Sequence, residues 1–242
     1  MQKIKVRGNV SLEELSRHNP LESHEVNLVG AVGVFCNPDM FPTLEGLKTW
    51  VDQGVVPVIG YHPRIPFSES NLAKLKEVLS FPGVAGLGEI GIDRTENVKT
   101  WASQARMVKR LLSLLLPEHV LVIHCRGMSN GVEVVDEAVL FMLALLAAHP
   151  SVRREQLIHL HCYTGSLEAL QEWIEEFPNT YVGFTPMVCG SDQLEETFRR
   201  VEISRLLLET DAPYFSPPGC KASTPHMIGW VAGRLATVRT IS

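Results

Sequence analysis

Histidine and carboxylate side chains recur at the ends of apolar runs in this 242-residue chain. The stretch "GVAGLGEIGID" contains Glu89 and ends at Asp93, and the stretch "VLVIHC" carries His124 near its end. A buried carboxylate is costly unless a positive group meets it. A divalent cation satisfies carboxylates and also takes imidazole ligands, so these residue types predict a metal centre.

Further residues of the same types follow other apolar runs. His62 comes after "VIGY", His159 and His161 lie in "LIHLHC", and Glu209 and Asp211 close "LLLETD". In parallel α/β folds, ligands bind where the carboxyl ends of the strands meet. Several such residues on successive strands therefore predict one shared site.

Each residue also has a purely structural interpretation. A histidine in an apolar strand is often a hydrogen-bonded core residue. Glu89 could instead pair with Arg126 or Arg106, and Asp211 before Ala-Pro could cap a turn. These interpretations need a separate explanation for each residue, whereas one bound cation accounts for all of these residues together.

The elements that must position these residues follow a regular alternation. The pattern predicts seven strands, at 26–35, 55–61, 84–90, 120–125, 157–162, 180–184 and 205–210. Helices are predicted at 43–53, 69–80, 97–116, 131–149, 166–177, 191–201 and 225–238, with a capping box at 11–14 that starts a further short helix. Near-continuous apolar strands between helices indicate a parallel sheet covered by helices.

A closed (β/α)₈ barrel needs eight strands, one more than the pattern contains. Either "KIKVRG" at 3–8 is a weak extra strand, or the first barrel strand is missing. An open doubly wound sheet is the alternative architecture. With no flexible linker or low-complexity segment in view, residues 1–242 are predicted to form a single domain.

Composition limits the classes of function. A hydrophobic content of 45% supports a sizeable core, and a net charge of −5 argues against general electrostatic capture of nucleic acid. The five cysteines form no CxxC pair, which predicts reduced thiols in an intracellular protein of the cytoplasm or nucleus. The N-terminal stretch lacks the apolar core of a signal peptide, and no apolar run is long enough for a membrane span. No obligate protein partner is evident.

Five motifs extend the strand ends described above: "GYHPR", "GLGEIGIDRT", "VIHCRG", "HLHCYTGS" and "LLLETDAPYF". Together they resemble the motifs of the TatD-type metal-dependent hydrolases, and they occur in the order of that family between about residues 26 and 215. The stretches "GAVGVFCNP" and "FPNTYVGFTP" resemble animal members of the TatD-domain-containing 2 type.

The resemblance implies a TIM-barrel, amidohydrolase-like fold that holds one or two divalent ions (Mg²⁺, Mn²⁺ or Zn²⁺) and hydrolyses phosphodiester bonds of DNA or RNA. Matched by motif, the implied metal ligands are Glu89, His124, His161 and Asp211. Glu89 and Asp211 are the implied catalytic residues, with Asp211 accepting the proton of a metal-activated water.

Four further residues are expected around that centre. His62 is implied to contact substrate or to support a metal ligand, and Asp93 to shape its loop or support a ligand. Arg64 and Arg126 are candidates for binding phosphate oxygens, because arginine pairs well with phosphate.

One departure from the family pattern affects the expected activity. The family begins with a strand that carries His-x-His, whereas the first histidines here are His18 and His24, outside any predicted strand. The expectation is therefore a shortened chain that binds one ion and has weak or no nuclease activity. The alternatives are a non-catalytic barrel that acts as a binding or scaffold protein, and a metal-dependent amidase or lactonase. The second alternative lacks a strand-end lysine that could bridge two metals.

Overall fold

The computed structural model describes residues 26–127 and 136–240. Its strands are β1 (Ala31–Phe35), β2 (Val55–Ile59), β3 (Gly86–Asp93), β4 (Val120–Arg126), β5 (Ile158–His161), β6 (Thr180–Phe184) and β7 (Leu206–Leu208). Its α-helices are α2 (Leu44–Asp52), α3 (Glu69–Leu79), α4 (Val98–Leu112), α5 (Glu137–Ala147), α6 (Leu167–Glu176), α7 (Asp192–Arg200) and α8 (Ile228–Thr240). Short 3₁₀ turns are η1 (Pro38–Met40), η2 (Pro186–Val188), η3 (Ile203–Arg205) and η4 (Pro225–Met227).

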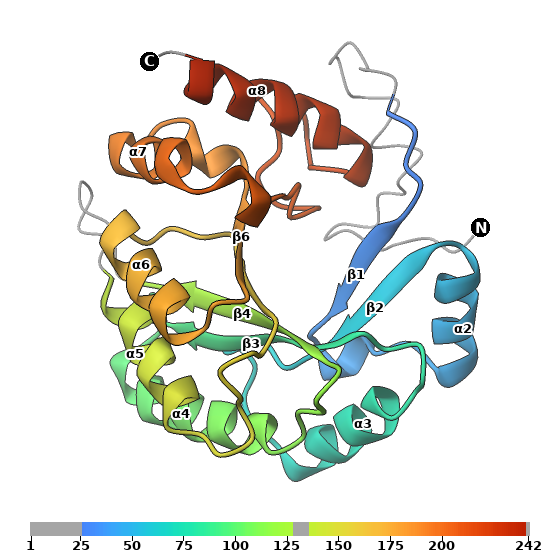
Figure 1. Cartoon of the computed structure of the whole chain (residues 1–242). Coiled ribbons are helices and arrows are strands. Elements are labelled where there is room, and N and C mark those ends of the chain that lie inside the picture. The colour runs from blue at the N-terminus through green and yellow to red at the C-terminus, as the bar shows by residue number, and fades with distance from the viewer. Residues whose placement is uncertain (1–25, 128–135, 241–242) are drawn as a thin grey trace. The chain divides into compact units, whose positions relative to one another are not determined.

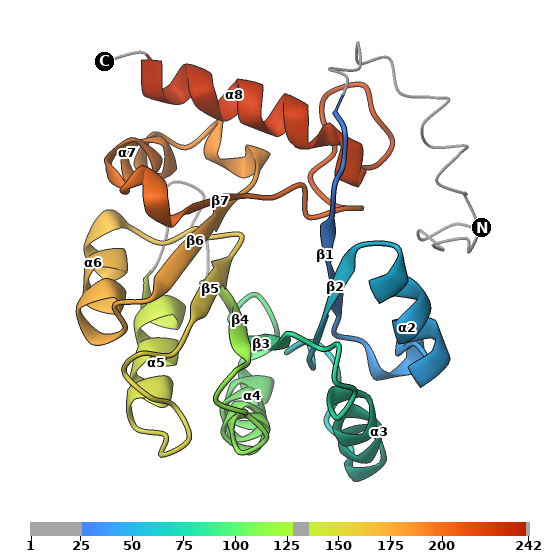
Figure 2. The same ribbon diagram turned by 45° about the vertical axis from the view of Figure 1, so that its right-hand side comes forward.

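The chain divides into two compact units, which we call the larger unit (Val29–Val182) and the smaller unit (the described residues 26–28 and 183–240). In the larger unit, neighbouring strands from β1 to the first half of β6 pair in parallel and in chain order. Helices α2 to α6 all lie on the outer side of this curved sheet (Figures 1 and 2).

This arrangement confirms the TIM-barrel type of fold. A doubly wound sheet places helices on both faces and reverses the strand order at a switch point. Neither feature occurs in the larger unit, where the strand order follows the chain and the helices share one side. The prediction of a single domain over residues 1–242 stays a prediction.

Polar caps set where the helices begin. The Thr43 side chain accepts a hydrogen bond from the backbone N–H of Gly46, and Ser68 and Ser166 cap α3 and α6 in the same way. Such a cap satisfies backbone donors that have no partner inside the helix. These residues stand next to the apolar helical patterns in the sequence, which is why the predicted helix starts lie close to the observed ones.

The strand predicted at 26–35 is shorter in the structure and begins at Ala31. The register explains the difference, because Ala31 pairs with Val55, the first residue of β2. Residues 26–30 therefore have no neighbouring strand on that side. The strand considered at 3–8, the capping box at 11–14 and the first part of the helix predicted at 131–149 lie outside the described residues.

Strand β3 runs through the centre of the larger unit, and all eight of its residues are buried. Leu87, Ile90 and Ile92 are fully buried, as are Leu121 and Ile123 on the neighbouring β4. Burial on both faces is characteristic of a central parallel strand between two layers. A charged residue in β3 is therefore removed from bulk water unless the site itself admits water.

The smaller unit contains β7, α7, α8 and the end of β6. The backbone N–H of Glu209 donates to the carbonyl of Phe184, which joins the segment after β7 to the end of β6. Arg199 donates to the carbonyl of Val238 at 2.8 Å and so ties α7 to α8. None of the helices in the described part of the chain has the length and apolarity needed to span a bilayer.

Candidate metal centre

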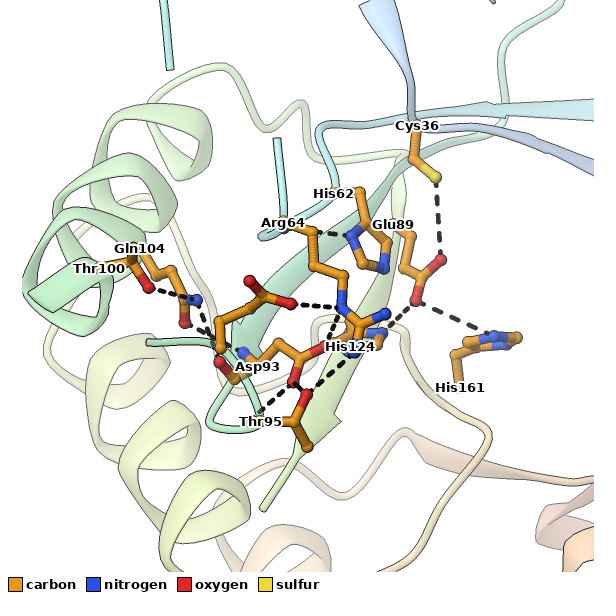
Figure 3. Close-up of polar contacts among 11 residues, drawn as sticks. Cys36, His62, Arg64, Glu89, Asp93, Thr95, Thr100, Gln104, His124 and His161 are labelled. Carbon is orange, nitrogen blue, oxygen red and sulfur yellow. Dashed lines mark hydrogen bonds and ion pairs between the residues drawn. The ribbon is translucent and has the colours of Figure 1, made fainter. Parts of the chain in front are cut away.

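A bulge in β3 determines where Glu89 points. Gly88 pairs with Val122 of β4, and the next pair joins Ile90 to Ile123, so Glu89 is an extra residue in the ladder. A bulge of this kind breaks the alternation of side chains and commonly re-aims one of them. The carboxylate of Glu89 is thereby directed toward the ends of the neighbouring strands (Figure 3).

Gly60 allows the chain after β2 to lie directly against this bulge. A Cβ atom at Gly60 would lie 2.1 Å from the carbonyl carbon of Gly88, a distance that no side chain tolerates. The close approach lets the backbone N–H of Tyr61 donate to the carbonyl of Glu89 at 3.0 Å. The backbone of the carboxylate residue is thus fixed from the side of β2.

Gly91 has the corresponding role on the side of β4. It pairs with His124, and its φ of +158° lies where side chains are rarely found. A Cβ atom there would lie 1.8 Å from the carbonyl oxygen of His124. The glycines of "GLGEIG" therefore permit the backbone contacts that bring Glu89 and His124 together.

Glu89 meets one imidazole directly and a second one nearby. Its Oε1 lies 2.5 Å from Nδ1 of His124 and 3.9 Å from Nε2 of His161, while its Oε2 accepts from the Cys36 thiol at 3.9 Å (Figure 3). Both Glu89 and His124 are more than nine-tenths buried as residues. The two carboxylate oxygens thus face different neighbours.

The charges in this cluster stabilise one another. Burial alone raises the pKa of Glu89, but the hydrogen bond with His124 and the nearby imidazole charges lower it to about 2. Burial alone lowers the pKa of His124, whereas its contacts with Asp93 and Glu89 raise it overall. The carboxylate is therefore ionised, and a positive charge at His124 is favoured.

Asp93 connects the cluster to an arginine. Its Oδ2 accepts from Nε of Arg64 at 2.8 Å and lies 3.4 Å from Nε2 of His124. Thr95 donates to its other oxygen through both the backbone N–H and the hydroxyl, and Arg64 also contacts Glu96 at 3.0 Å. Burial raises the pKa of Asp93, but the contacts with His124 and Thr95 lower it well below its usual range.

Gln104 on α4 holds the backbone of Asp93 from the helix layer. Its side-chain oxygen accepts the N–H of Asp93 at 3.0 Å, and its side-chain nitrogen donates to the carbonyl of Asp93 at 3.0 Å. Gln104 is almost completely buried. The amide side chain thus satisfies the same two backbone groups that a neighbouring strand would satisfy.

His62 lies edge-on against His124, with 4.7 Å between the ring centroids. One potential ligand atom each from His62, Glu89 and His124 lie within 4.8 Å of one another. Burial lowers the pKa of His62, and the charge on His124 lowers it further, to about 4. Its Nδ1 accepts the backbone N–H of Arg64 at 3.2 Å, so the neutral ring carries its proton on Nε2 and is a hydrogen-bond donor there.

The larger unit brings together six of the predicted site residues. Glu89, His124, His62, Asp93 and Arg64 form one connected cluster, and His161 borders it. Among the described residues, Glu89 pairs with neither Arg126 nor Arg106; the arginine of the cluster is Arg64, which binds Asp93 instead. The roles assigned to these residues stay predictions.

Arg126 and Asp211 are the two remaining predicted residues. Arg126 is the last residue of β4, is half-buried, and has no side-chain ion pair among the described residues. Asp211 belongs to the smaller unit, in the loop after β7, with a φ of +44° and its carbonyl accepting from Tyr214. Aspartate is one of the few side chains that adopts this backbone conformation readily.

Sequence reasoning missed three residues that shape the cluster: Cys36, Thr95 and Gln104. Thr95 had a usable signal, since a threonine two residues after an aspartate often closes a local turn. Cys36 directly follows β1, so a search of all strand ends would have included it. Gln104 lies in the middle of α4, and nothing in its position marks it as a partner of Asp93.

Replacing Asp93 with asparagine is expected to weaken Mn²⁺ binding by about 10- to 100-fold, because residues that orient metal ligands typically contribute that much. Asparagine keeps the size but loses the charge that faces His124 and Arg64. Isothermal titration of the purified chain with Mn²⁺ measures the change. Asp52→Asn, an exposed carboxylate on α2, is the matched control and should bind as the unmodified chain does.

A curled parallel sheet with outer helices and an imidazole–carboxylate cluster at the strand ends defines a TIM-barrel protein with a site of the metal-binding type. The sequence model of the family described as TatD related DNase matches residues 13–242. This chain therefore belongs to the TatD related DNase family.

Relatives in the family show modest identity. A human protein named 3'-5' RNA nuclease TATDN2 is 31% identical over 194 residues, which cover 78% of this chain and 24% of that protein. A protein from Edwardsiella piscicida named 3'-5' ssDNA/RNA exonuclease TatD is 31% identical over 200 residues, covering 78% of this chain and 70% of that protein. The chain thus matches about a quarter of the length of the human relative.

Solved structures support the fold. A TatD homologue from Escherichia coli K12 superposes with a TM-score of 0.69 at 19% identity, covering 86% of this chain and 78% of that chain. An uncharacterized amidohydrolase from Saccharomyces cerevisiae superposes with a TM-score of 0.65 at 16% identity, covering 88% and 84%. At these identities the likeness concerns the architecture alone.

Proposed function

We propose that this protein is a divalent-metal-dependent hydrolase that cleaves phosphodiester bonds of DNA or RNA. The observation that carries the proposal is the buried pair of Glu89 and His124, whose ligand atoms lie 2.5 Å apart at the strand ends with the half-buried His62 beside them. The family membership and the nuclease names of its relatives supply the substrate class. The five cysteines form no disulfide, which supports a reducing, intracellular location in the cytoplasm or nucleus.

The residues present fit a divalent ion. Oε1 of Glu89 and Nδ1 of His124 lie 2.5 Å apart, and two such lone-pair atoms need a proton or a cation between them. The other ring nitrogen of His124 is buried and faces the Asp93 carboxylate at 3.4 Å, the kind of partner that a metal-ligating histidine usually has on its second nitrogen. When His124 is neutral, as a metal ligand must be, Arg64 offsets the charge of Asp93 and a cation would offset that of Glu89.

Glu89 and His124 would hold the ion, with His161 and Asp211 as the further ligands carried over by motif. Nitrogen and oxygen ligands together suit Mn²⁺ or Zn²⁺, and Mg²⁺ where water completes the coordination. A bound divalent ion polarises phosphoryl oxygens and lowers the pKa of water. Asp211 is the proposed general base of the reaction.

The other residues of the cluster bind and orient. His62 presents an Nε2–H, which can donate to a phosphate oxygen, in keeping with its predicted contact to substrate. Asp93 holds His124 and Arg64 through its two contacts. Arg64 is half-exposed and offers a fixed positive charge to a phosphate beside the centre. Arg126 is a second candidate for that contact.

The function is tested on the full chain with single-stranded DNA and RNA labelled at the 5' end. In Mn²⁺ or Mg²⁺ we expect a ladder of products that shorten from the 3' end, and EDTA should stop the reaction. A chain that binds Mn²⁺ and cleaves neither substrate would contradict the nuclease proposal and favour a non-catalytic binding protein. Cleavage of amide or lactone substrates alone would place the chain in another hydrolase class.

Arg64→Ala is expected to raise the KM for single-stranded substrate by about tenfold while kcat changes little, because a charge-assisted contact to phosphate contributes about 1.5 kcal/mol. Steady-state kinetics at low salt measures both constants. Arg64→Lys should recover part of the loss, since it keeps the charge without the planar fork. Equal falls in kcat for both variants would argue that Arg64 acts through the metal centre instead.

A further inference from the structure

Helix α5 differs from the other helices of the larger unit in its composition. Between Glu137 and the end of the helix, "AVLFMLALLA" contains no charged or polar side chain. Helices α2, α3, α4 and α6 each carry several charged residues on their outer faces. A helix that is apolar on every side is normally covered on every side.

The inner face of α5 is covered as expected. Ala138, Val139, Met142 and Leu146 are fully or almost fully buried, and Trp173 of α6 donates to the carbonyl of Val139 at 3.1 Å. This contact and the position of the two helices in both views place α5 beside α6 (Figures 1 and 2). Packing against the rest of the larger unit therefore covers only part of the apolar surface of α5.

The outer face of α5 lines a groove next to α6. The groove has a volume of about 400 Å³, and α5 contributes Leu140, Leu143, Ala144 and Ala147. The two leucines are half-buried and the two alanines are exposed. An apolar stripe that remains accessible beside a helix is the usual form of a surface on which another helix packs.

The opposite wall of the groove is acidic. It consists of Glu172, Glu175 and Glu176 on α6, all exposed, and none of them forms an ion pair with another described residue. The nearby Arg154 donates to the backbone carbonyl of Glu176 rather than to a carboxylate. The groove thus combines an apolar floor with three uncompensated negative charges on one wall.

We propose that this groove between α5 and α6 is a docking surface for an amphipathic helix of a partner protein that carries apolar side chains on one face and basic side chains beside them. The apolar face would cover Leu140 and Leu143, and its lysines or arginines would meet the glutamates of α6. Charge complementarity favours this partner over a second copy of the chain in a symmetric arrangement, because the latter would bring two acidic walls together. The surface is separate from the metal centre and does not depend on the proposed function.

The test uses a synthetic helical peptide with leucines at helical spacing on one face and lysines flanking them, labelled with a fluorophore. Fluorescence anisotropy with the full chain should show saturable binding that weakens as salt is added. The same peptide with glutamates in place of the lysines should bind at least about tenfold more weakly. Absence of saturable binding of the lysine peptide would overturn the proposal.

Two double variants separate this groove from general attraction to a negatively charged protein. Glu172→Lys/Glu175→Lys reverses the acidic wall at exposed positions and should weaken binding by at least about tenfold. Glu45→Lys/Glu77→Lys makes the same change in net charge at exposed positions of α2 and α3 and should leave binding within about twofold. Equal losses in both variants would overturn the assignment of the peptide to the groove.

Sedimentation velocity on the unmodified chain tests the remaining alternative, in which a second copy of the chain occupies the groove. The proposal expects no self-association that depends on this surface. A dimer that Leu143→Ser abolishes, with circular dichroism unchanged, would show that a second copy covers the groove and would overturn the proposal of a basic partner.

Discussion

Glu89→Gln is expected to weaken Mn²⁺ binding by at least about 100-fold, more than the loss of a residue that only orients a ligand. Glutamine keeps the shape of the side chain but removes the negative charge that faces His124 and His161. It also replaces one carboxylate oxygen by a nitrogen that cannot bind a cation. Isothermal titration of the purified chain with Mn²⁺, with circular dichroism to verify folding, measures the effect.

The matched control is Glu77→Gln, an exposed carboxylate on α3 in the same unit. It makes the same chemical change at a position with no part in the cluster, and its Mn²⁺ affinity should equal that of the unmodified chain. A folded Glu89→Gln variant that still binds Mn²⁺ within about threefold of the unmodified affinity would show that the ion is held elsewhere.

Gly91→Ala is expected to lower the free energy of unfolding by about 3 kcal/mol or more, combining a clash in a packed core with an unfavourable backbone conformation. The added Cβ would lie 1.8 Å from the carbonyl oxygen of His124, and the φ of Gly91 is +158°. The three nearest atoms are all backbone atoms of His124, so no flexible group can move away. Urea unfolding followed by circular dichroism measures the loss.

Gly233→Ala on α8 provides the comparison for this prediction. A Cβ atom at Gly233 would have no atom within 4 Å, and the residue lies inside a helix. Alanine should therefore stabilise the chain by up to about 1 kcal/mol, because it reduces the conformational freedom of the unfolded state. If both variants lost stability equally, the close contact at Gly91 would not be the cause.

Much of the fold follows from local patterns that are readable in the sequence. The apolar run at 180–184 coincides with β6, and α6 and α7 begin directly after the serines that cap them. These features depend on neighbours in the chain, namely side-chain periodicity and caps. The expectation that Glu89 and His124 lie close together also follows from the sequence, because the ends of parallel strands meet at one edge of the sheet.

The details of the site depend on contacts between distant segments. The bulge at Glu89 arises where β3 meets β4, and strict alternation of side chains cannot reveal it. The pairing of Asp93 with Arg64 joins residues 29 positions apart, one at the end of β3 and the other in the loop after β2. The sequence offered Arg126 and Arg106 as partners of Glu89, and only the path of the chain shows that Arg64 joins the cluster, at Asp93.

The two hydrogen bonds between the Gln104 side chain and the backbone of Asp93 affect the thermodynamics of ligand binding. Because a buried helix residue fixes both backbone groups of Asp93, the end of β3 is ordered when the chain folds. The loss of conformational entropy there belongs to folding and does not oppose the arrival of an ion or a substrate. The amide proton of Asp93 should accordingly exchange with solvent as slowly as those of the central strands, with or without a bound ligand.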